Sequence, residues 1–248
     1  MNNYRSSGFM NLPPVVKNLI IINALMLLAY YTFGSVFNIN LNRELGFYFF
    51  ASNHFEPYQV VTHMFMHGGI AHLFFNMFAL FMFGRVLEAV WGPKRFFIYY
   101  MVTGLGAMLI HALVNYIHFI SLKNNISPEQ FQIVIDRGYQ ALMNNQNFRN
   151  EAMAQLNLIL NIPTVGASGA VFGVLLAFGM LFPNTQLMLL FPPIPIKAKY
   201  FVIFYGILEL WLGVTQPGSN IAHFAHLGGM LFGFILIKLW NSQRNKFY

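Results

Sequence analysis

Long apolar segments separated by short polar ones are the feature of this sequence that most restricts its fold. Of the 248 residues, 57% are hydrophobic and only 8% are charged, whereas soluble domains contain roughly 25% charged residues. Each apolar segment is close to the roughly 20 residues that a helix needs to cross a bilayer. The sequence therefore predicts an all-α, polytopic transmembrane helix bundle. Six spans are expected, at about residues 18–37, 69–91, 95–118, 165–182, 199–214 and 221–239. The fifth is the shortest and carries a charged residue, Glu209.

These spans divide the chain into one membrane domain with polar ends. Residues 1–17 are a short N-terminal segment, residues 18–240 the six-helix membrane domain, and residues 241–248 a tail. The first apolar run is longer than the apolar region of a signal peptide and has no convincing small-residue cleavage site, so we interpret it as a retained span. The long polar stretch is an outer loop, residues 119–163, in which amphipathic helix is expected at about residues 128–160.

The basic residues indicate the orientation of the bundle. With the N-terminus inside, ten of the 14 Lys and Arg residues lie on the cytoplasmic side, and Arg43, Lys123, Arg137 and Arg149 lie outside. This asymmetry follows the positive-inside rule and predicts a multi-pass protein of a bacterial inner membrane with both termini cytoplasmic. The net charge of +7 is spread over the ends of the apolar runs, so the expected partner is the lipid bilayer and not nucleic acid.

In this orientation the second, fourth and sixth spans all begin at the outer face. His72 and Asn76 lie in the first two turns of the second span, Ser168 in the fourth and His226 in the sixth. At 1.5 Å of rise per residue, these polar groups would lie within roughly 10 Å of the same level. Polar groups inside spans are costly and usually face the bundle interior or a water-filled cavity, so we expect the four side chains to converge.

The fourth span opens with a serine between small residues, Gly166-Ala167-Ser168-Gly169. One interpretation is structural: the small residues allow helices to pack closely, and the serine bonds to a preceding carbonyl. The sixth span offers His226 followed by a Gly229 to Gly233 face, which matches the Gly169 to Gly173 face of the fourth. Close approach of these two helices would bring Ser168 and His226 together as a nucleophile and its general base.

Other residue types narrow the chemistry. The chain contains no cysteine, which excludes a thiol nucleophile and thiolate metal sites. Its one aspartate, Asp136, lies in the long loop, so a Ser-His-Asp triad is not expected and a dyad is the economical mechanism. The spacing does not reveal what orients the imidazole of His226.

Two pairs of residues at i, i+4 spacing need separate interpretations. His72 and Asn76 share one face of the second span, where with the Ser168 backbone N–H they could donate to an oxyanion; alternatively, Asn76 bonds another helix. His63 and His67 could suggest a metal site, but they lack the glutamate of H-E-x-x-H. We therefore expect them to order the loop before the second span, and we expect no metal and no cofactor.

Taken together, these motifs resemble the rhomboid family. The resemblance rests on His67 through Asn76, Gly84 with Glu88, Gly166 to Gly169, and Ala225-His226-Leu227-Gly228-Gly229 with Gly233, in the family's order and on its helices. It implies a six-helix bundle with a water-accessible cavity that opens to the outside. It also implies a protein that cleaves the membrane-anchored helices of other proteins. It implies Ser168 as nucleophile, His226 as base, His72 and Asn76 as oxyanion donors, and Phe172 as the aromatic residue packed on the histidine.

The resemblance also leaves an alternative. A non-catalytic rhomboid-like protein that binds membrane helices would share the bundle, although such proteins typically lack the serine or the histidine. The resemblance implies that residues 215–220, before the sixth span, act as a gate for substrate. The oligomeric state and the natural substrate cannot be read from the sequence.

Overall fold

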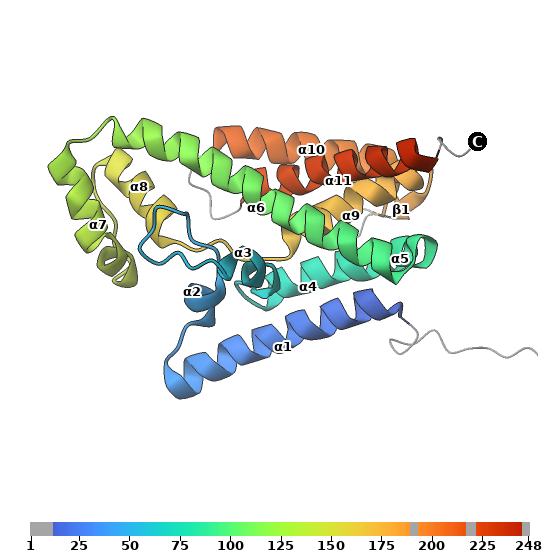
Figure 1. The fold of residues 1–248 in the computed structure, drawn as a ribbon, viewed down its shortest axis with the longest axis horizontal. Helices are drawn as coiled ribbons and strands as arrows, with labels where there is room; N and C mark the ends of the chain where they lie inside the picture. Colours follow the sequence, from blue (N-terminus) through green and yellow to red (C-terminus); the bar gives the residue numbers. More distant parts are fainter. Residues whose placement is uncertain (1–11, 189–192, 217–221, 245–248) are drawn as a thin grey trace, which may run out of the picture.

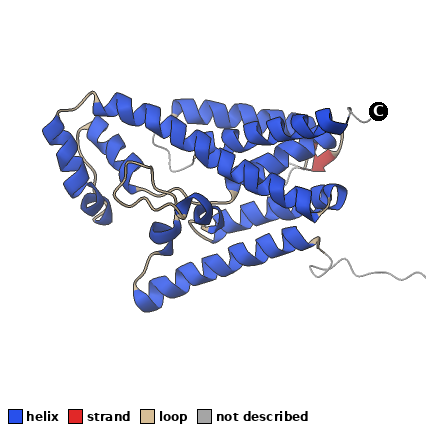
Figure 2. Ribbon diagram, in the orientation of Figure 1, coloured by secondary structure: helices blue, strands red, loops and turns tan. Residues whose placement is uncertain are grey.

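The computed structural model describes residues 12–188, 193–216 and 222–244, and these form a helical bundle. Figure 1 shows the long helices running roughly along one axis, and Figure 2 shows that strand is confined to a hairpin at one end. The hairpin pairs β1 (Gln186–Met188) with β2 (Pro195–Lys197) in antiparallel fashion. The long helices are α1 (Pro14–Phe37), α4 (Ile70–Ala79) continuing into α5 (Arg85–Trp91), α6 (Pro93–Lys123), α9 (Ser168–Leu181), α10 (Ala198–Thr215) and α11 (His223–Arg244).

The predicted spans correspond closely to these helices. Within the described part of the chain, five helices are long and apolar enough to cross a membrane: Pro14–Phe37, Ile70–Trp91, Pro93–Lys123, Ala198–Thr215 and His223–Asn241. The remaining predicted span is α9, whose 14 residues are apolar but fewer. The all-α polytopic bundle is therefore confirmed, with one span shorter than the others.

The length of α9 has a geometric consequence. At 1.5 Å per residue, this helix is roughly 21 Å long, against roughly 30 Å for the hydrocarbon core of a bilayer. Its neighbour α6 has 31 residues. The chain before α9 therefore reaches the level of Ser168 without helix, and the first residue of α9 lies within the length of the bundle.

The helices α6, α9 and α11 form the centre of the bundle and approach one another through glycines. A Cβ atom placed on Gly229 of α11 would collide with the backbone of Gly169 in α9. The other three glycines of the two predicted faces meet α6, because Gly169 lies against Ala107, Gly173 against Thr103 and Gly233 against the Tyr99 hydroxyl. The glycine faces thus bring α9 and α11 together and also admit the central α6.

Glu88 fixes the N-terminal end of α1 from a distance in sequence. Its two carboxylate oxygens accept hydrogen bonds from the backbone N–H groups of Val15 and Val16, at 2.9 and 2.8 Å. The first N–H groups of a helix have no partner within the helix, and the helix dipole favours a negative charge there. Since no side chain of α1 itself caps this end, the α5 glutamate supplies the cap.

The segment between α1 and α4 is packed and not an open loop. It contains the short helices α2 (Leu41–Leu45) and α3 (Gln59–Thr62), followed by a 3-10 turn, His63–Phe65. Phe47 and Tyr48 are buried, and Phe47 pairs through its backbone with Thr164 in the segment that leads to α9. This pairing joins the two connections that precede the site-bearing helices α4 and α9.

The long loop between α6 and α9 forms a helical hairpin. It consists of α7 (Pro128–Met143), which starts with a capping box at Ser127 and Gln130, and α8 (Glu151–Asn161). The hairpin has its own small core, in which Val134, Leu156 and Leu160 are buried. The helix predicted within the loop is thus two helices, and α6 runs to Lys123, five residues beyond the predicted end.

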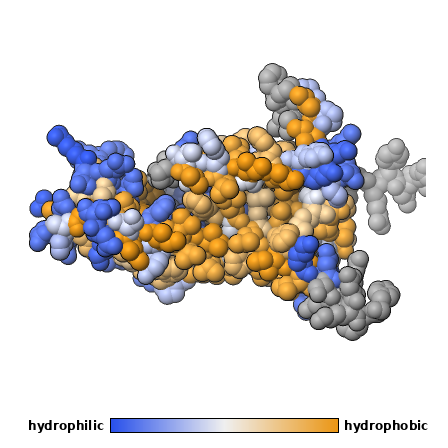
Figure 3. Space-filling model, turned by 90° about the horizontal axis from the view of Figure 1, so that it is seen from above, coloured by the Kyte–Doolittle hydropathy of each residue, from blue (hydrophilic) through white to orange (hydrophobic). Residues whose placement is uncertain are grey.

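The surface agrees with a membrane location. Figure 3 shows a broad apolar surface in the middle of the molecule with polar surface toward both ends. The Pro14 end of α1 and the Arg244 end of α11 lie at the same end of the bundle, opposite the hairpin of α7 and α8 (Figure 1). The chain is an integral membrane protein.

Candidate active site

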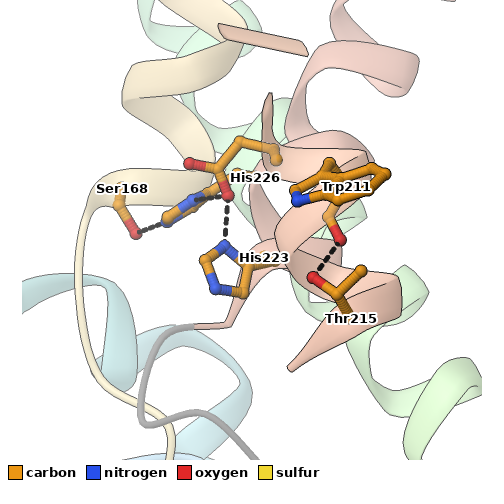
Figure 4. A network of polar contacts seen from close by, with 6 residues as sticks. Ser168, Trp211, Thr215, His223 and His226 are labelled. Carbon is orange, nitrogen blue, oxygen red and sulfur yellow. Dashed lines mark hydrogen bonds and ion pairs between the residues drawn. The ribbon is translucent and has the colours of Figure 1, made fainter. Parts of the chain in front are cut away.

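The structure brings the serine and the histidine predicted for chemistry into contact. Ser168 is the first residue of α9, and His226 lies in the first turn of α11. The Oγ atom of Ser168 lies 2.8 Å from Nε2 of His226, and Figure 4 shows the two side chains facing each other. A hydroxyl at this distance can donate its hydrogen to a neutral imidazole nitrogen.

Glycine at position 166 makes room for this arrangement. Gly166 has φ +133°, in the region that favours glycine, and its N–H donates to the His63 carbonyl at 2.9 Å. A Cβ atom there would meet the His72 ring at 2.9–3.0 Å, and Ser168 Oγ at 3.6 Å. The segment before α9 therefore places Ser168 beside His72 only while residue 166 has no side chain.

Phe172 stacks on the histidine, one turn after the serine. Its ring lies parallel to that of His226, with an interplanar angle of 4° and centroids 4.2 Å apart. One face of the imidazole is thereby covered, which restricts rotation of the ring about its bond to Cβ.

His72 and Asn76 lie on α4 and line the same cavity as Ser168. The backbone N–H of Gly68 donates to Nδ1 of His72 at 3.3 Å, so the hydrogen of a neutral ring is on Nε2, the nitrogen beside Gly166. The Asn76 amide donates one hydrogen to the His72 carbonyl, at 2.9 Å. An amide nitrogen carries two hydrogens, so a second remains for a ligand.

Glu209, on α10, contacts the opposite edge of the His226 ring. Its Oε2 atom lies 2.9 Å from Nδ1 of His226 and 2.7 Å from Nδ1 of His223. The His223 contact has hydrogen-bond geometry. The His226 contact is less well aligned, and its Nδ1 is buried without a hydrogen-bond partner among the described residues. Ser168, His226 and Glu209 thus form a row of side chains from three helices.

The sequence did not predict the place of Glu209 or His223. The chain's one aspartate, Asp136, lies in α7, where it accepts a hydrogen bond from Gln132 at 2.9 Å. The carboxylate beside Nδ1 of His226, where a triad would have its acid, belongs to Glu209. The available signal was a carboxylate inside an apolar span, which is costly and needs a partner. Sequence spacing could not show that this partner is His226, because it does not fix how α10 is rotated against α11.

The same three residues have the composition of a cation site. One ligand atom each from Glu209, His223 and His226 lies within 4.8 Å of the others. The N···O separations of 2.7 and 2.9 Å are those of N–H···O contacts, whereas ligands about a tetrahedral zinc with bonds near 2 Å stand roughly 3.3 Å apart. The geometry fits hydrogen bonding, and the expected absence of metal and cofactor stays a prediction.

A cavity of about 1280 Å³ adjoins these side chains, and its lining includes Ser168, His226, His72 and Asn76. Apolar walls come from α4 and α10, both of which pack on α9 but scarcely touch each other. The wall residues include Phe74, Phe75 and Phe78 on α4 and Phe201 and Tyr205 on α10. The reactive pair therefore faces a partly open, largely apolar cavity between two spans.

The histidines before α4 have other surroundings. Nδ1 of His63 donates to the Gln59 carbonyl at 2.9 Å, and His67 is buried with its ring 5.0 Å from that of His72. Burial lowers the pKa of His63 and of His67 to about 4.

Of the predicted gate, the structure describes only Thr215 and Gln216, and the other residues lie outside the described ranges; Thr215 donates to the Trp211 carbonyl at 2.8 Å (Figure 4).

Fold and site together define a class: polytopic helical membrane proteins with a serine and a histidine in contact inside the bundle. The chain matches the Rhomboid domain over residues 54–242, which is more than half of its length. The chain belongs to the rhomboid family, and the resemblance found in the sequence is confirmed.

Individual relatives differ in what their names state. "RHOMBOID-like protein 12, mitochondrial" of Arabidopsis thaliana is 28% identical over 87% of this chain and 55% of that protein. "Putative rhomboid protease YdcA" of Bacillus subtilis is 24% identical over 78% of this chain and 72% of that protein. "Inactive RHOMBOID-like protein 8" of Arabidopsis thaliana is 32% identical over 46% of this chain and 31% of that protein. The chain spans about half the length of the mitochondrial relatives from Arabidopsis and yeast that it matches.

Proposed function

We propose that the chain is an intramembrane serine endopeptidase that cleaves transmembrane segments of other membrane proteins. The observation that carries this proposal is the 2.8 Å contact between Ser168 Oγ and His226 Nε2 at a cavity within an apolar bundle. Nucleophile and base within hydrogen-bond reach, with the base held by further contacts, are the signature of an activated serine.

In the proposed acylation step, Ser168 Oγ attacks the scissile carbonyl carbon while its proton passes to Nε2 of His226. The new C–O bond turns the carbonyl oxygen into an oxyanion. When this intermediate collapses, the C–N bond breaks and the same proton moves from His226 to the leaving amine. The products are a free amine and an acyl-enzyme at Ser168.

Deacylation repeats these steps with water. His226 takes a proton from the water as its oxygen attacks the ester carbon. The C–O bond to Ser168 then breaks, and the proton returns to Oγ. The cycle leaves a carboxylic acid on the second fragment and the original Ser168–His226 pair.

The oxyanion would be held by donors on two helices. Nε2–H of His72, the second amide hydrogen of Asn76 and the backbone N–H of Ser168 are the proposed donors. Donors aimed at charge that develops in the transition state usually contribute the largest electrostatic part of catalysis. The tautomer of His72 set by Gly68 supports this role.

A membrane-embedded substrate fits the position of the cavity. Its walls on α4 and α10 are aromatic, and their scarce mutual contact leaves a route from the lipid to Ser168. The proposed orientation has both termini cytoplasmic, as the basic residues favour. Residence in a bacterial inner membrane stays a prediction, since relatives include both a Bacillus subtilis protein and proteins named mitochondrial.

Fluorophosphonate labelling of the purified protein in detergent tests the proposal. Wild type should label and cleave a model transmembrane substrate, and Ser168→Ala and His226→Ala should each lose both activities, because acylation needs the nucleophile and the base. Thermal unfolding of each variant, expected to match wild type within about 5 °C, serves as the folding control. Folded wild type that neither labels nor cleaves would favour the non-catalytic, helix-binding alternative, for which one relative is named inactive.

A further inference from the structure

The carboxylate of Glu209 faces the one ring nitrogen of His226 that the proposed mechanism does not use. Nε2 of His226 faces Ser168, and Nδ1 lies 2.9 Å from Glu209 Oε2. Both residues are buried, and among the described residues no other carboxylate contacts the ring. The base therefore lies between a nucleophile on α9 and an acid on α10.

This contact determines which tautomer of His226 is compatible with the fold. With hydrogen on Nε2, the Nδ1 lone pair would point at a carboxylate oxygen 2.9 Å away, which is repulsive. With hydrogen on Nδ1, the N–H faces that oxygen, and Nε2 is free to accept the Ser168 proton. Glu209 thus favours the tautomer that can act as a base.

The contact with His223 indicates that Glu209 acts as an ionised acceptor. One carboxylate oxygen lies within 2.9 Å of two Nδ1 atoms. An ionised oxygen accepts from both Nδ1–H groups, whereas a protonated oxygen would donate to one ring and hold that ring in the other tautomer. His223 would thereby anchor the carboxylate that orients His226.

We propose that Glu209 is a positioning residue that completes a Ser168–His226–Glu209 triad, held in turn by His223. This inference rests on the proposed function and extends it. When His226 takes the serine proton, it becomes an imidazolium beside a fixed negative charge. At the low effective dielectric inside an apolar bundle, this attraction is stronger than it would be between the same two groups in water. The less aligned His226 contact is compatible with this role, because catalytic hydrogen bonds often tighten only in the substrate complex.

A purely structural role is the competing explanation, and the chain offers a matched control. Glu88 is the other buried glutamate, and it caps the start of α1. It is not among the residues that line the cavity. We compare Glu209→Gln with Glu88→Gln for kcat and KM on a model substrate, fluorophosphonate labelling rate and thermal unfolding. If a glutamate only supports the fold, its replacement by glutamine should lower the stability of the protein and leave kcat per folded molecule unchanged.

For Glu209→Gln we expect kcat and labelling rate to fall together by roughly 10⁴-fold, the scale found when a triad acid is replaced by an amide or lost. KM should change by less than about threefold, because the carboxylate does not touch substrate. Glu88→Gln should unfold at a lower temperature with kcat within about threefold of wild type. A Glu209→Gln enzyme with kcat within threefold of wild type overturns the inference.

A second measurement needs no Glu209 variant and covers the case in which Glu209→Gln does not fold. Side-chain ¹⁵N spectra of histidine-labelled wild type, assigned with His226→Gln, report the tautomer of His226. Hydrogen on Nδ1 is expected, and hydrogen on Nε2 overturns the inference. Wild type that does not cleave or label defeats the proposed function instead, and the tautomer then still decides whether Glu209 orients the ring of His226.

Discussion

Asn76 makes one amide hydrogen bond within α4, so a second amide hydrogen remains for the proposed oxyanion. We expect Asn76→Ala to lower kcat roughly 10- to 1000-fold, the scale for loss of one oxyanion donor. Labelling by a fluorophosphonate, whose oxygen occupies the same place, should slow as well. Full activity in a folded Asn76→Ala protein would remove this residue from the site.

The buried histidines before α4 predict an acid-sensitive fold. Their pKa values are lowered by burial to about 4 from 6.5 in the exposed state. Between these pH values the unfolded chain binds more protons than the folded one. The contribution of these two histidines to the free energy of unfolding is therefore fully present above pH 6.5 and declines as the pH falls toward 4. Thermal unfolding in detergent at several pH values should show this decline.

The variant with His63→Gln and His67→Gln is the control for that measurement. It should unfold at a lower temperature at neutral pH but lose less stability between pH 6.5 and 4, because glutamine does not titrate. An unchanged slope would assign the acid sensitivity to other groups.

At the residue scale, the sequence predicted contacts between residues that lie at the same depth in the bundle on different helices. Ser168 and His226 could be matched because both open a span and both spans carry glycine faces. Glu209 and His223 could not be matched in this way. Their contact depends on how α10 is rotated about its axis, and an apolar helix with no strong polar face does not reveal that rotation.

At the scale of elements, five predicted spans lie close to their observed helices, because the run of apolar residues determines where a membrane helix begins and ends. The differences lie where tertiary contacts decide. The π-helical turn Leu80–Gly84 joins α4 to α5, and α6 extends to Lys123 over the hairpin of α7 and α8. The cap that Glu88 provides for α1 joins residues more than 70 positions apart, which no local pattern can show.

For the whole molecule, the proposed protease activity and the position of Ser168 along the bundle together predict where a substrate is cut. In the proposed orientation, and with Leu181 at the inner edge of the apolar layer, a 14-residue α9 places the serine roughly 9 Å below the outer edge, which is about six helical residues. Mass spectrometry of the fragments should place the cleaved bond roughly four to eight residues inside the outer end of the substrate span. A cut at the centre of the span, or outside the membrane, would contradict this placement.

The short α9 therefore bears on what becomes of the fragments. A span of roughly 20 residues cut at that depth leaves an outer piece with about six apolar residues and an inner piece with about 14. The outer piece has too little apolar surface to stay anchored, and the inner piece is too short to cross the bilayer. Each cut would release one fragment on the outer side and leave the other as a stub held from the inner side.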